Sequence, residues 1–184
     1  MKSSLKNMLL SLTGITVIAG AILAAVNIST EKPIAEGAER ARNEAIAAIL
    51  PRFDHLEQTI ATDADGDSLT VYVATLEGTG SGVAVETFSN NGFGGHISII
   101  AGFDNNGHLC GYRVLQHAET PGLGANMDKW FMADGTSHNI IGTDAPLAVK
   151  ADGGDVDAIT GATITSRAFL QAINRARSAA ANIR

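Results

Sequence analysis

The stretch HISIIAGFDNNGHLCGYRVL, residues 96–115, decides the fold of this 184-residue chain. Two strand-like runs, 96–103 and 108–115, flank the tetrapeptide Asp104-Asn105-Asn106-Gly107. Asn-Gly favours a tight hairpin turn, because both residues tolerate the positive φ angles that such a turn requires. The stretch therefore predicts the clearest antiparallel strand pair of the chain.

Further strands and helices are predicted on both sides of this hairpin. Residues 69–76 and 83–88 are strand-like runs joined by the turn-rich loop 78–82. Residues 127–132 are expected to form a short helix, and an amphipathic helix begins near Thr163 and closes the chain. The pattern predicts an α+β domain with a twisted, mainly antiparallel sheet flanked by helices.

An uncharged segment lies near the start of the chain, from residue 7 to residue 30. As a helix, its apolar body is about 30 Å long, which matches the hydrocarbon core of a bilayer. Lys2 and Lys6 precede it and acidic residues follow it, so the positive-inside rule places the N-terminus in the cytoplasm. We expect a single-pass protein of the cell (inner) membrane whose C-terminal domain is extracytoplasmic, or periplasmic in cells with two membranes. A cleaved signal peptide is the competing interpretation, which Ala24-Ala25 keep open.

Three parts of the chain follow from these patterns. Residues 1–30 are expected to form the cytoplasmic N-terminus and the transmembrane helix. Residues 31–62 are expected to form a linker and a helix, in which Pro33 suits the first turn and Pro51 ends the apolar repeat. Residues 63–184 form the extracytoplasmic domain. The small apolar stripe of the middle helix packs on this domain or on another membrane subunit, and the domain is favoured.

Composition and charge exclude several classes of function. The formal net charge is −6 and no basic run contains aromatic residues, so nucleic-acid binding is not expected. Cys110 is the single cysteine, which excludes an internal disulfide and a multi-cysteine metal or iron–sulfur site. The five histidines show no ligand spacing, and the acidic stretch 63–67 lacks the twelfth-position glutamate of a calcium loop. We therefore expect a solvated turn at 63–67 and no metal.

Three glycine-rich segments occur in order along the domain. They are Asn91-Gly92-Phe93-Gly94-Gly95, the sequence HAETPGLG at 117–124, and Thr160-Gly161-Ala162-Thr163. Glycine lets the backbone approach a flat ligand closely, although a glycine in a loop most often only serves a turn. The three segments together predict a ligand site built from several loops.

Thr163 stands where the last of these segments enters the closing helix. As the N-cap, its oxygen would lie among unpaired backbone N–H groups at the positive end of the helix dipole, where a phosphate is stable. Arg167 follows one helical turn later. A simple helix cap is the alternative. A hydrolase with Ser166 as nucleophile is not expected, because the chain has no Gly-x-Ser-x-Gly motif.

Residues 157–163 closely resemble the motif Asp-x-x-Ser/Thr-Gly-Ala-Thr, on whose final threonine a flavin transferase attaches FMN through a phosphoester. With Gly-Phe-Gly-Gly at 92–95 and Glu-Thr-Pro-Gly-Leu-Gly at 119–124, the chain resembles the G subunit of the Rnf electron-transport complex. That protein is a relative of the C subunit of the sodium-pumping NADH:quinone reductase. The resemblance implies FMN bound covalently to Thr163, no catalytic side chain, and Asp157 as part of the signal that the transferase reads. The other cofactor-binding residues that it implies are Thr160, Gly161, Ala162, Thr165, Glu119, Thr120, Pro121, Gly122, Leu123 and Gly124.

The resemblance further implies a membrane-anchored flavoprotein that relays electrons within an ion-translocating ferredoxin:NAD+ oxidoreductase. The complex would be a translocase, whereas the isolated chain need not be an enzyme. The expected partners are the other membrane and peripheral Rnf subunits and the maturing flavin transferase. One edge of the flavin should be exposed, and Phe93 or Trp130 either covers a ring face or lies in the core. The alternatives are a stand-alone membrane-anchored FMN redox or sensor protein, and a flavin-free extracytoplasmic binding module.

Overall fold

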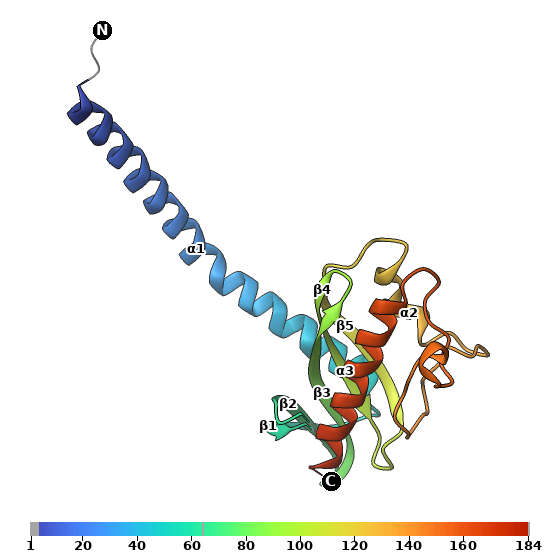
Figure 1. Ribbon diagram of the computed structural model, residues 1–184. Helices are drawn as coiled ribbons and strands as arrows, with labels where there is room; N and C mark the ends of the chain where they lie inside the picture. The colour runs from blue at the N-terminus through green and yellow to red at the C-terminus, as the bar shows by residue number, and fades with distance from the viewer. Residues whose placement is uncertain (1–3, 64, 184) are drawn as a thin grey trace. The chain divides into compact units, whose positions relative to one another are not determined.

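The computed structural model describes residues 4–63 and 65–183 (Figure 1). The chain divides into two compact units, Met1–Ala41 and Arg42–Arg184. Helix α1 (Leu5–Ile49) forms the described part of the first unit and continues into the second. The second unit contains the sheet, the other helices and all the loops that carry the glycine-rich segments.

α1 is one continuous helix of 45 residues rather than a membrane span followed by a separate helix. Pro33 lies inside it, although the sequence predicts a helix start there. A proline removes one backbone hydrogen bond, and the turns on both sides of it stay helical. The helix ends at Ile49, before Pro51, as predicted. By length and composition, α1 is apolar enough to cross a membrane, and its large apolar side chains up to Ile28 are 54–76% exposed.

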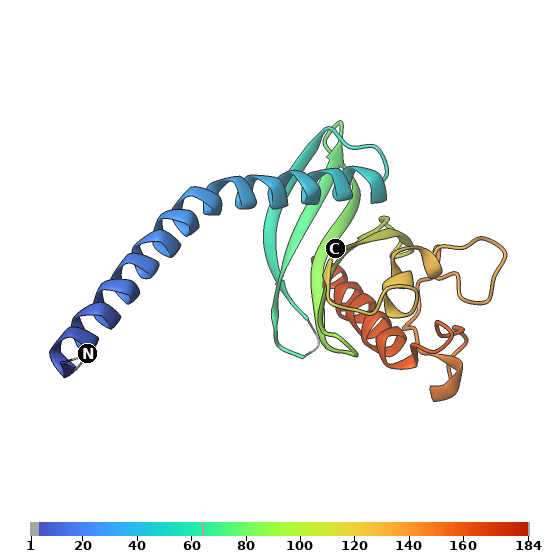
Figure 2. The ribbon, with the colours of Figure 1, turned by 90° about the horizontal axis from the view of Figure 1, so that it is seen from above.

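Five antiparallel strands form one open sheet, in the order in which they occur along the chain. They are β1 (His55–Thr62), β2 (Ser68–Leu76), β3 (Thr79–Gly92), β4 (Gly95–Phe103) and β5 (Leu109–His117). The sheet is twisted (Figure 2), and the predicted hairpin is the β4–β5 pair. Because helices pack on this sheet, the α+β class is confirmed.

Two parts of the sheet differ from the sequence prediction. β1 lies in the segment where only a linker and a helix are predicted. The sequence gives no strand signal there, because most side chains of this edge strand are exposed and show no apolar alternation. The turn between β2 and β3 consists of Glu77 and Gly78, with φ angles of 51° and 77°. Two positive φ values make a tight hairpin, so residues 79–82 already belong to β3.

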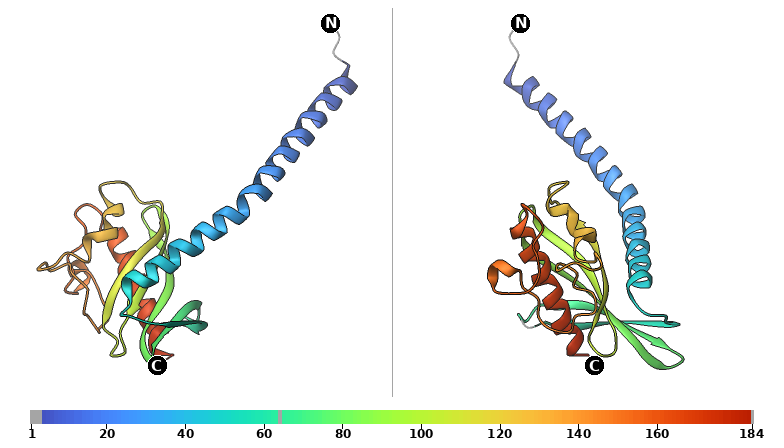
Figure 3. Two further views of the ribbon diagram at one scale, coloured as in Figure 1. Left: turned by 180° about the vertical axis from the view of Figure 1, so that it is seen from behind. Right: turned by 90° about the vertical axis from the view of Figure 1, so that its right-hand side faces the viewer.

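The two faces of the sheet are covered by different helices (Figure 3). α3 (Thr163–Ala181) packs on one face and buries Phe169 and Ile173, which lie on its predicted apolar side. The last turns of α1 pack on the other face, where Ile49 is buried. A Cβ at Gly102 of β4 would lie only 3.0 Å from Ile49 Cγ1, so glycine allows this close contact. The C-terminal end of the predicted apolar stripe, which includes Ala45 and Ile49, thus packs on the domain.

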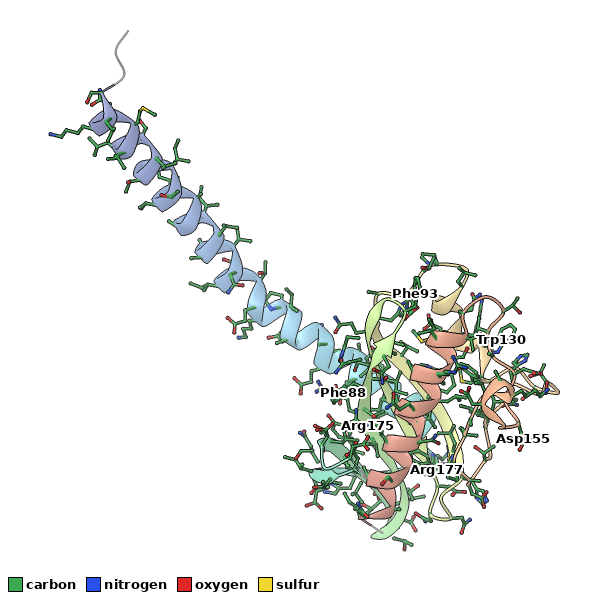
Figure 4. The ribbon with its side chains drawn as sticks, in the orientation of Figure 1. Phe88, Phe93, Trp130, Asp155, Arg175 and Arg177 are labelled. Atoms are coloured by element: carbon green, nitrogen blue, oxygen red, sulfur yellow. The ribbon has the colours of Figure 1, made fainter. Side chains whose placement is uncertain are left out.

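Arg175 fixes α3 to the strands around it (Figure 4). Its guanidinium pairs with Asp63 at 2.6 Å and with Asp67 at 2.5 Å, and it lies 4.4 Å from the centre of the Phe88 ring. Burial by itself would raise the pKa of Asp63, but hydrogen bonds from Arg175 and from the backbone of Asp67 and Asp65 lower that pKa below its ordinary value. Asp65, Gly66 and Asp67 are exposed, as expected for a solvated turn, and only the side chain of Asp63, at 6% exposed, is buried among the described residues of this turn.

Most of the chain between β5 and α3 is irregular. It contains three short helices, η1 (Gly124–Asn126), α2 (Met127–Trp130) and η2 (Lys150–Asp152). α2 is the predicted short helix in a shorter form. The turn between β3 and β4, the loop after β5 and the start of α3 meet at one end of the domain (Figure 1). This end contains all three glycine-rich segments.

Candidate functional site

The start of α3 is shaped by a turn around Gly161. Gly161 has a φ of +74°, which favours glycine, and the N–H of Ala162 donates to the carbonyl of Ile159 at 2.9 Å. Ala162 is the N-cap residue and makes no side-chain capping hydrogen bond. Thr163 is therefore the first helical residue and not the N-cap, which corrects the sequence prediction. The first intrahelical bond runs from the N–H of Ser166 to the Ala162 carbonyl at 3.0 Å.

The first turn of α3 offers free hydrogen-bond donors. Within residues 4–63 and 65–183, the backbone N–H groups of Thr163, Ile164 and Thr165 make no hydrogen bond. α3 is 19 residues long, and its dipole adds positive potential at this end. The side chain of Thr163 is half-buried. An anion such as a phosphate can therefore bind here beside an accessible hydroxyl.

Ser166 is fully buried beneath this turn. Its hydroxyl accepts a hydrogen bond from the N–H of Ile159 at 2.9 Å and donates one to the carbonyl of Ala162 at 3.0 Å. Both bonds tie the turn to α3. Ser166 thus supports the position of the residue that starts the helix.

Glu119, in the second glycine-rich segment, bonds to the first segment and to the helical turn that follows the third. Its side chain comes from the loop after β5 and is 6% exposed. One carboxylate oxygen accepts the N–H of Gly94, in the turn between β3 and β4, at 2.9 Å. The other accepts the hydroxyl of Thr165, in the first turn of α3, at 2.7 Å. A single buried carboxylate therefore holds together segments that lie 25 and 46 residues apart.

Glycine is required at three positions around this carboxylate, the first being Gly92, where a Cβ would lie 2.6 Å from Glu119 Oε1. A Cβ at Gly124 would collide with Glu119 Oε2 and would lie 2.8 Å from the hydroxyl oxygen of Thr165. A Cβ at Gly94 would collide with the carbonyl of Ala118. These glycines serve close packing between loops, which goes beyond the conformational freedom of a single turn.

A cavity of about 370 Å³ opens beside this junction. Its lining residues are Phe93, Glu119, Thr120, Leu123, Gly124, Gly161, Ala162, Thr163, Ile164 and Thr165. Five large apolar side chains of the described part of residues 42–184 are exposed, and three of them belong to this lining, namely Phe93, Leu123 and Ile164. Phe93, at the tip of the β3–β4 hairpin, is 71% exposed (Figure 4). The volume and the apolar rim are those of a small-molecule site.

The structure brings most of the predicted site residues to this cavity. Thr160, Pro121 and Gly122 are exceptions, because they are exposed and do not line it. Phe93 lines the cavity rather than the core. Ile164 also lines the cavity, although the sequence analysis did not predict it. Its position between two threonines at the start of a helix could have indicated an exposed apolar side chain at the site.

Trp130 and Asp157 lie outside the cavity. Trp130 stacks on His138 with ring centres 4.2 Å apart, and its indole N–H donates to the carbonyl of Asp157 at 3.2 Å. The carboxylate of Asp157 pairs with Lys150 at 2.8 Å and accepts a hydrogen bond from Ser137. These two partners lower the pKa of Asp157, Lys150 having the larger effect. Asp157 thus lies on the partly exposed surface beside the turn.

Arg167 and His117 are basic residues near the cavity in sequence, and both bind other groups. Arg167 donates two hydrogen bonds to Asp152, at 2.6 and 2.7 Å. These hydrogen bonds lower the pKa of Asp152 below its ordinary value. His117 accepts the backbone N–H of Glu119 on its Nδ1 atom at 3.1 Å. Glu119 is therefore the one charged side chain among the described residues that line the cavity.

A larger cavity of about 670 Å³ runs along another side of α3. Its charged side chains include Arg167 and Arg175, which are already paired with carboxylates. Of the predicted site residues, none lines it. The smaller cavity is therefore the better candidate for the site.

The family model for the FMN-binding domain matches residues 92–178, a range that contains every residue of the smaller cavity. Residues 92–178 are thus similar to the FMN-binding domain, and α1 is a candidate membrane helix.

Curated relatives identify the family. The chain is 34% identical to the G subunit of the ion-translocating oxidoreductase complex of Shewanella amazonensis over 190 residues, which cover 95% of this chain and 86% of the relative. It is 35% identical to the corresponding G subunit of Pseudomonas aeruginosa, over 95% of this chain and 87% of the relative. The match to the G subunit of Aliivibrio fischeri reaches 42% identity but spans 59% of this chain and about half, 54%, of that relative. The chain belongs to the family of G subunits of ion-translocating oxidoreductase complexes.

Proposed function

We propose that this chain carries FMN on Thr163 through a phosphoester and relays electrons within an ion-translocating ferredoxin:NAD+ oxidoreductase complex. The observation that carries the proposal is the position of Thr163. Its half-buried hydroxyl starts α3, at the rim of the 370 Å³ cavity and beside three N–H groups without an acceptor. A covalently attached phosphate fits this combination of hydroxyl, donors and cavity.

The helix end supplies part of the phosphate site. A phosphate that is esterified twice keeps about one negative charge, which a helix N-terminus stabilises by about 0.3–1 kcal/mol. Such an interaction orients the group but is too weak to retain it. A covalent bond retains the cofactor, which matters for a domain outside the cytoplasm, where a dissociated flavin would be diluted.

The cavity suits the flavin ring. Phe93, Leu123 and Ile164 offer an apolar rim, while Glu119 and Thr165 offer buried polar groups. When bound, FMN supplies the one- or two-electron redox chemistry. The residues of the chain place the ring, limit its contact with water and leave one edge accessible to the electron donor and acceptor in the complex.

The proposed location is the cell (inner) membrane, with α1 as a single span and the FMN-binding domain extracytoplasmic. The two lysines before the apolar stretch support this orientation. A span with no charged side chain offers no path for an ion, so other membrane subunits would provide that path. A flavin transferase would attach the FMN.

The test is the intact mass of the denatured full-length protein, co-expressed with a flavin transferase and exported. We expect wild type to gain the mass of FMN minus one water and Thr163→Ala to gain nothing. Thr120→Ala is the matched control, because it removes another threonine hydroxyl from the same cavity and should stay loaded. An unmodified wild type beside an active transferase would contradict the proposal and favour a flavin-free binding module. Purification without any polytopic membrane protein would favour a stand-alone redox or sensor protein.

A further inference from the structure

We propose that the buried carboxylate of Glu119 lowers the reduction potential of the flavin in this site, in addition to holding the three loops together. The inference rests on the proposed function, because it requires FMN in the cavity beside Glu119. Its observations are the burial of this carboxylate, its two hydrogen bonds and the lack of a cation among the lining residues.

The hydrogen bonds fit an ionised carboxylate. The N–H of Gly94 can only donate, and it donates to one oxygen at 2.9 Å. The hydroxyl of Thr165 donates to the other oxygen at 2.7 Å. Two oxygens that both accept hydrogen bonds are the pattern of a carboxylate that carries a negative charge.

No cation compensates this charge within the described part of the cavity lining. The nearest basic residue in sequence to the start of α3 is Arg167, and its guanidinium is held by Asp152 in a bidentate pair. The ring of His117 accepts the backbone N–H of Glu119 on Nδ1 and makes no ion pair with the carboxylate. Among the described lining residues, the carboxylate of Glu119 is therefore a fixed negative charge that has hydrogen-bond donors but no side-chain cation beside it.

The charge acts on the flavin through simple repulsion. Uptake of two electrons and one proton by the oxidised ring adds one negative charge to it; the electrons come from a donor protein in the complex or from dithionite in the test. Two like charges in a partly buried cavity repel each other more than they would in water. The carboxylate therefore favours the oxidised flavin and lowers its reduction potential. The same carboxylate also positions the loops, so the test must separate charge from structure.

The test is a redox titration of full-length, flavin-loaded protein in detergent, with the flavin absorbance as readout. Glu119→Gln keeps the size of the side chain and removes the charge. We expect it to increase the ratio of reduced to oxidised flavin at a fixed potential at least tenfold, which is about 30 mV for a two-electron couple. Glu57→Gln is the matched control, because it makes the same chemical change on the exposed edge strand β1 and should leave the ratio unchanged.

Two further variants separate the charge from the structural role. Thr165→Val removes the hydrogen bond to Glu119 but keeps its charge, so it should not increase the ratio. Leu123→Lys adds a cation at the exposed rim and should increase it without touching the junction. An unchanged ratio in loaded Glu119→Gln, or an equal increase in Thr165→Val, would overturn the inference.

If Glu119→Gln fails to fold or to take up FMN, loaded Thr165→Val decides the question: without this hydrogen bond the charge of Glu119 is less shielded, so a decreased ratio supports the inference and an unchanged or increased ratio refutes it. Failure of the proposed function gives a different result, since wild type itself would then carry no FMN by mass.

Discussion

Replacing Arg175 by methionine tests how α3 is held in place. Methionine keeps most of the length of the side chain but removes the guanidinium that pairs with Asp63 and Asp67 and donates to the carbonyl of Phe88 at 2.9 Å. The side chain of Asp63 would then be buried without its cation. We expect Arg175→Met to lower the free energy of unfolding strongly while the fold remains the same.

The magnitude follows from the burial of each partner. The side chain of Asp67 is 56% exposed, so solvent screens that pair to about 0–1 kcal/mol. The side chains of Asp63 and Arg175 are 0% and 10% exposed, and removing one partner of such a pair typically costs about 3–5 kcal/mol. Asp63 keeps two backbone N–H donors, those of Asp65 and Asp67, which favours the lower end, about 3 kcal/mol.

Urea unfolding of the full-length protein in detergent measures this loss, followed by the fluorescence of Trp130, the single tryptophan. Arg167→Met is the control, because Arg167 is also ion-paired on α3 but is half exposed, and it should change stability little. Adding Asp63→Asn to Arg175→Met should recover part of the loss, since the amide still accepts a backbone N–H and has no charge. A loss below about 1 kcal/mol in Arg175→Met, or a further loss in the double variant, would refute the assignment of a buried ion pair.

Two further predictions concern pH and the cavity rim. The pKa of Asp63 is lower in the folded protein than its ordinary value. Its contribution to stability is therefore present above the unfolded pKa of about 3.9 and is lost as the pH falls through the folded pKa. Urea unfolding should show this loss of stability below about pH 5, and the dependence of stability on pH should be flatter in Asp63→Asn. Phe93→Ala should change the free energy of unfolding by no more than about 0.5 kcal/mol, because Phe93 is 71% exposed. The same variant should increase quenching of the flavin fluorescence by iodide, and equal quenching in wild type and variant would show that Phe93 does not cover the ring.

The sequence predicted those strands and helices whose local signals agree with their tertiary environment. The turn at 104–107 and the apolar runs beside it predicted β4 and β5, and helical periodicity predicted α3. β1 escaped prediction because HLEQTIAT is an edge strand with mostly exposed side chains, whose partner β2 determines its conformation. The turn at Glu77-Gly78 was obscured by further glycines, which belong to β3.

The segments that form the candidate site were predictable from the sequence, but the contacts between them were not. The motif around Thr163 and the loop at 119–124 were predicted from their resemblance to family motifs and from the order of the three glycine-rich segments. Nothing local indicates that Glu119 contacts Gly94 and Thr165, since those hydrogen bonds join residues 25 and 46 positions away. Only the packing of α3 on the sheet brings these partners together.

α3 serves the core and the proposed cofactor at different places along its length. Its first turn lies at the cavity, whereas Arg175 lies twelve residues after Thr163, about 18 Å farther along a helix that rises ~1.5 Å per residue. Sites separated by more than about 7–10 Å usually contribute independently. Loss of the Arg175 pair should therefore destabilise the domain without changing the flavin potential, whereas loss of the Glu119 charge should change the potential. Because Arg175 fixes α3 well beyond its first turn, the charge at the cavity can change without loosening the attachment of the helix to the sheet.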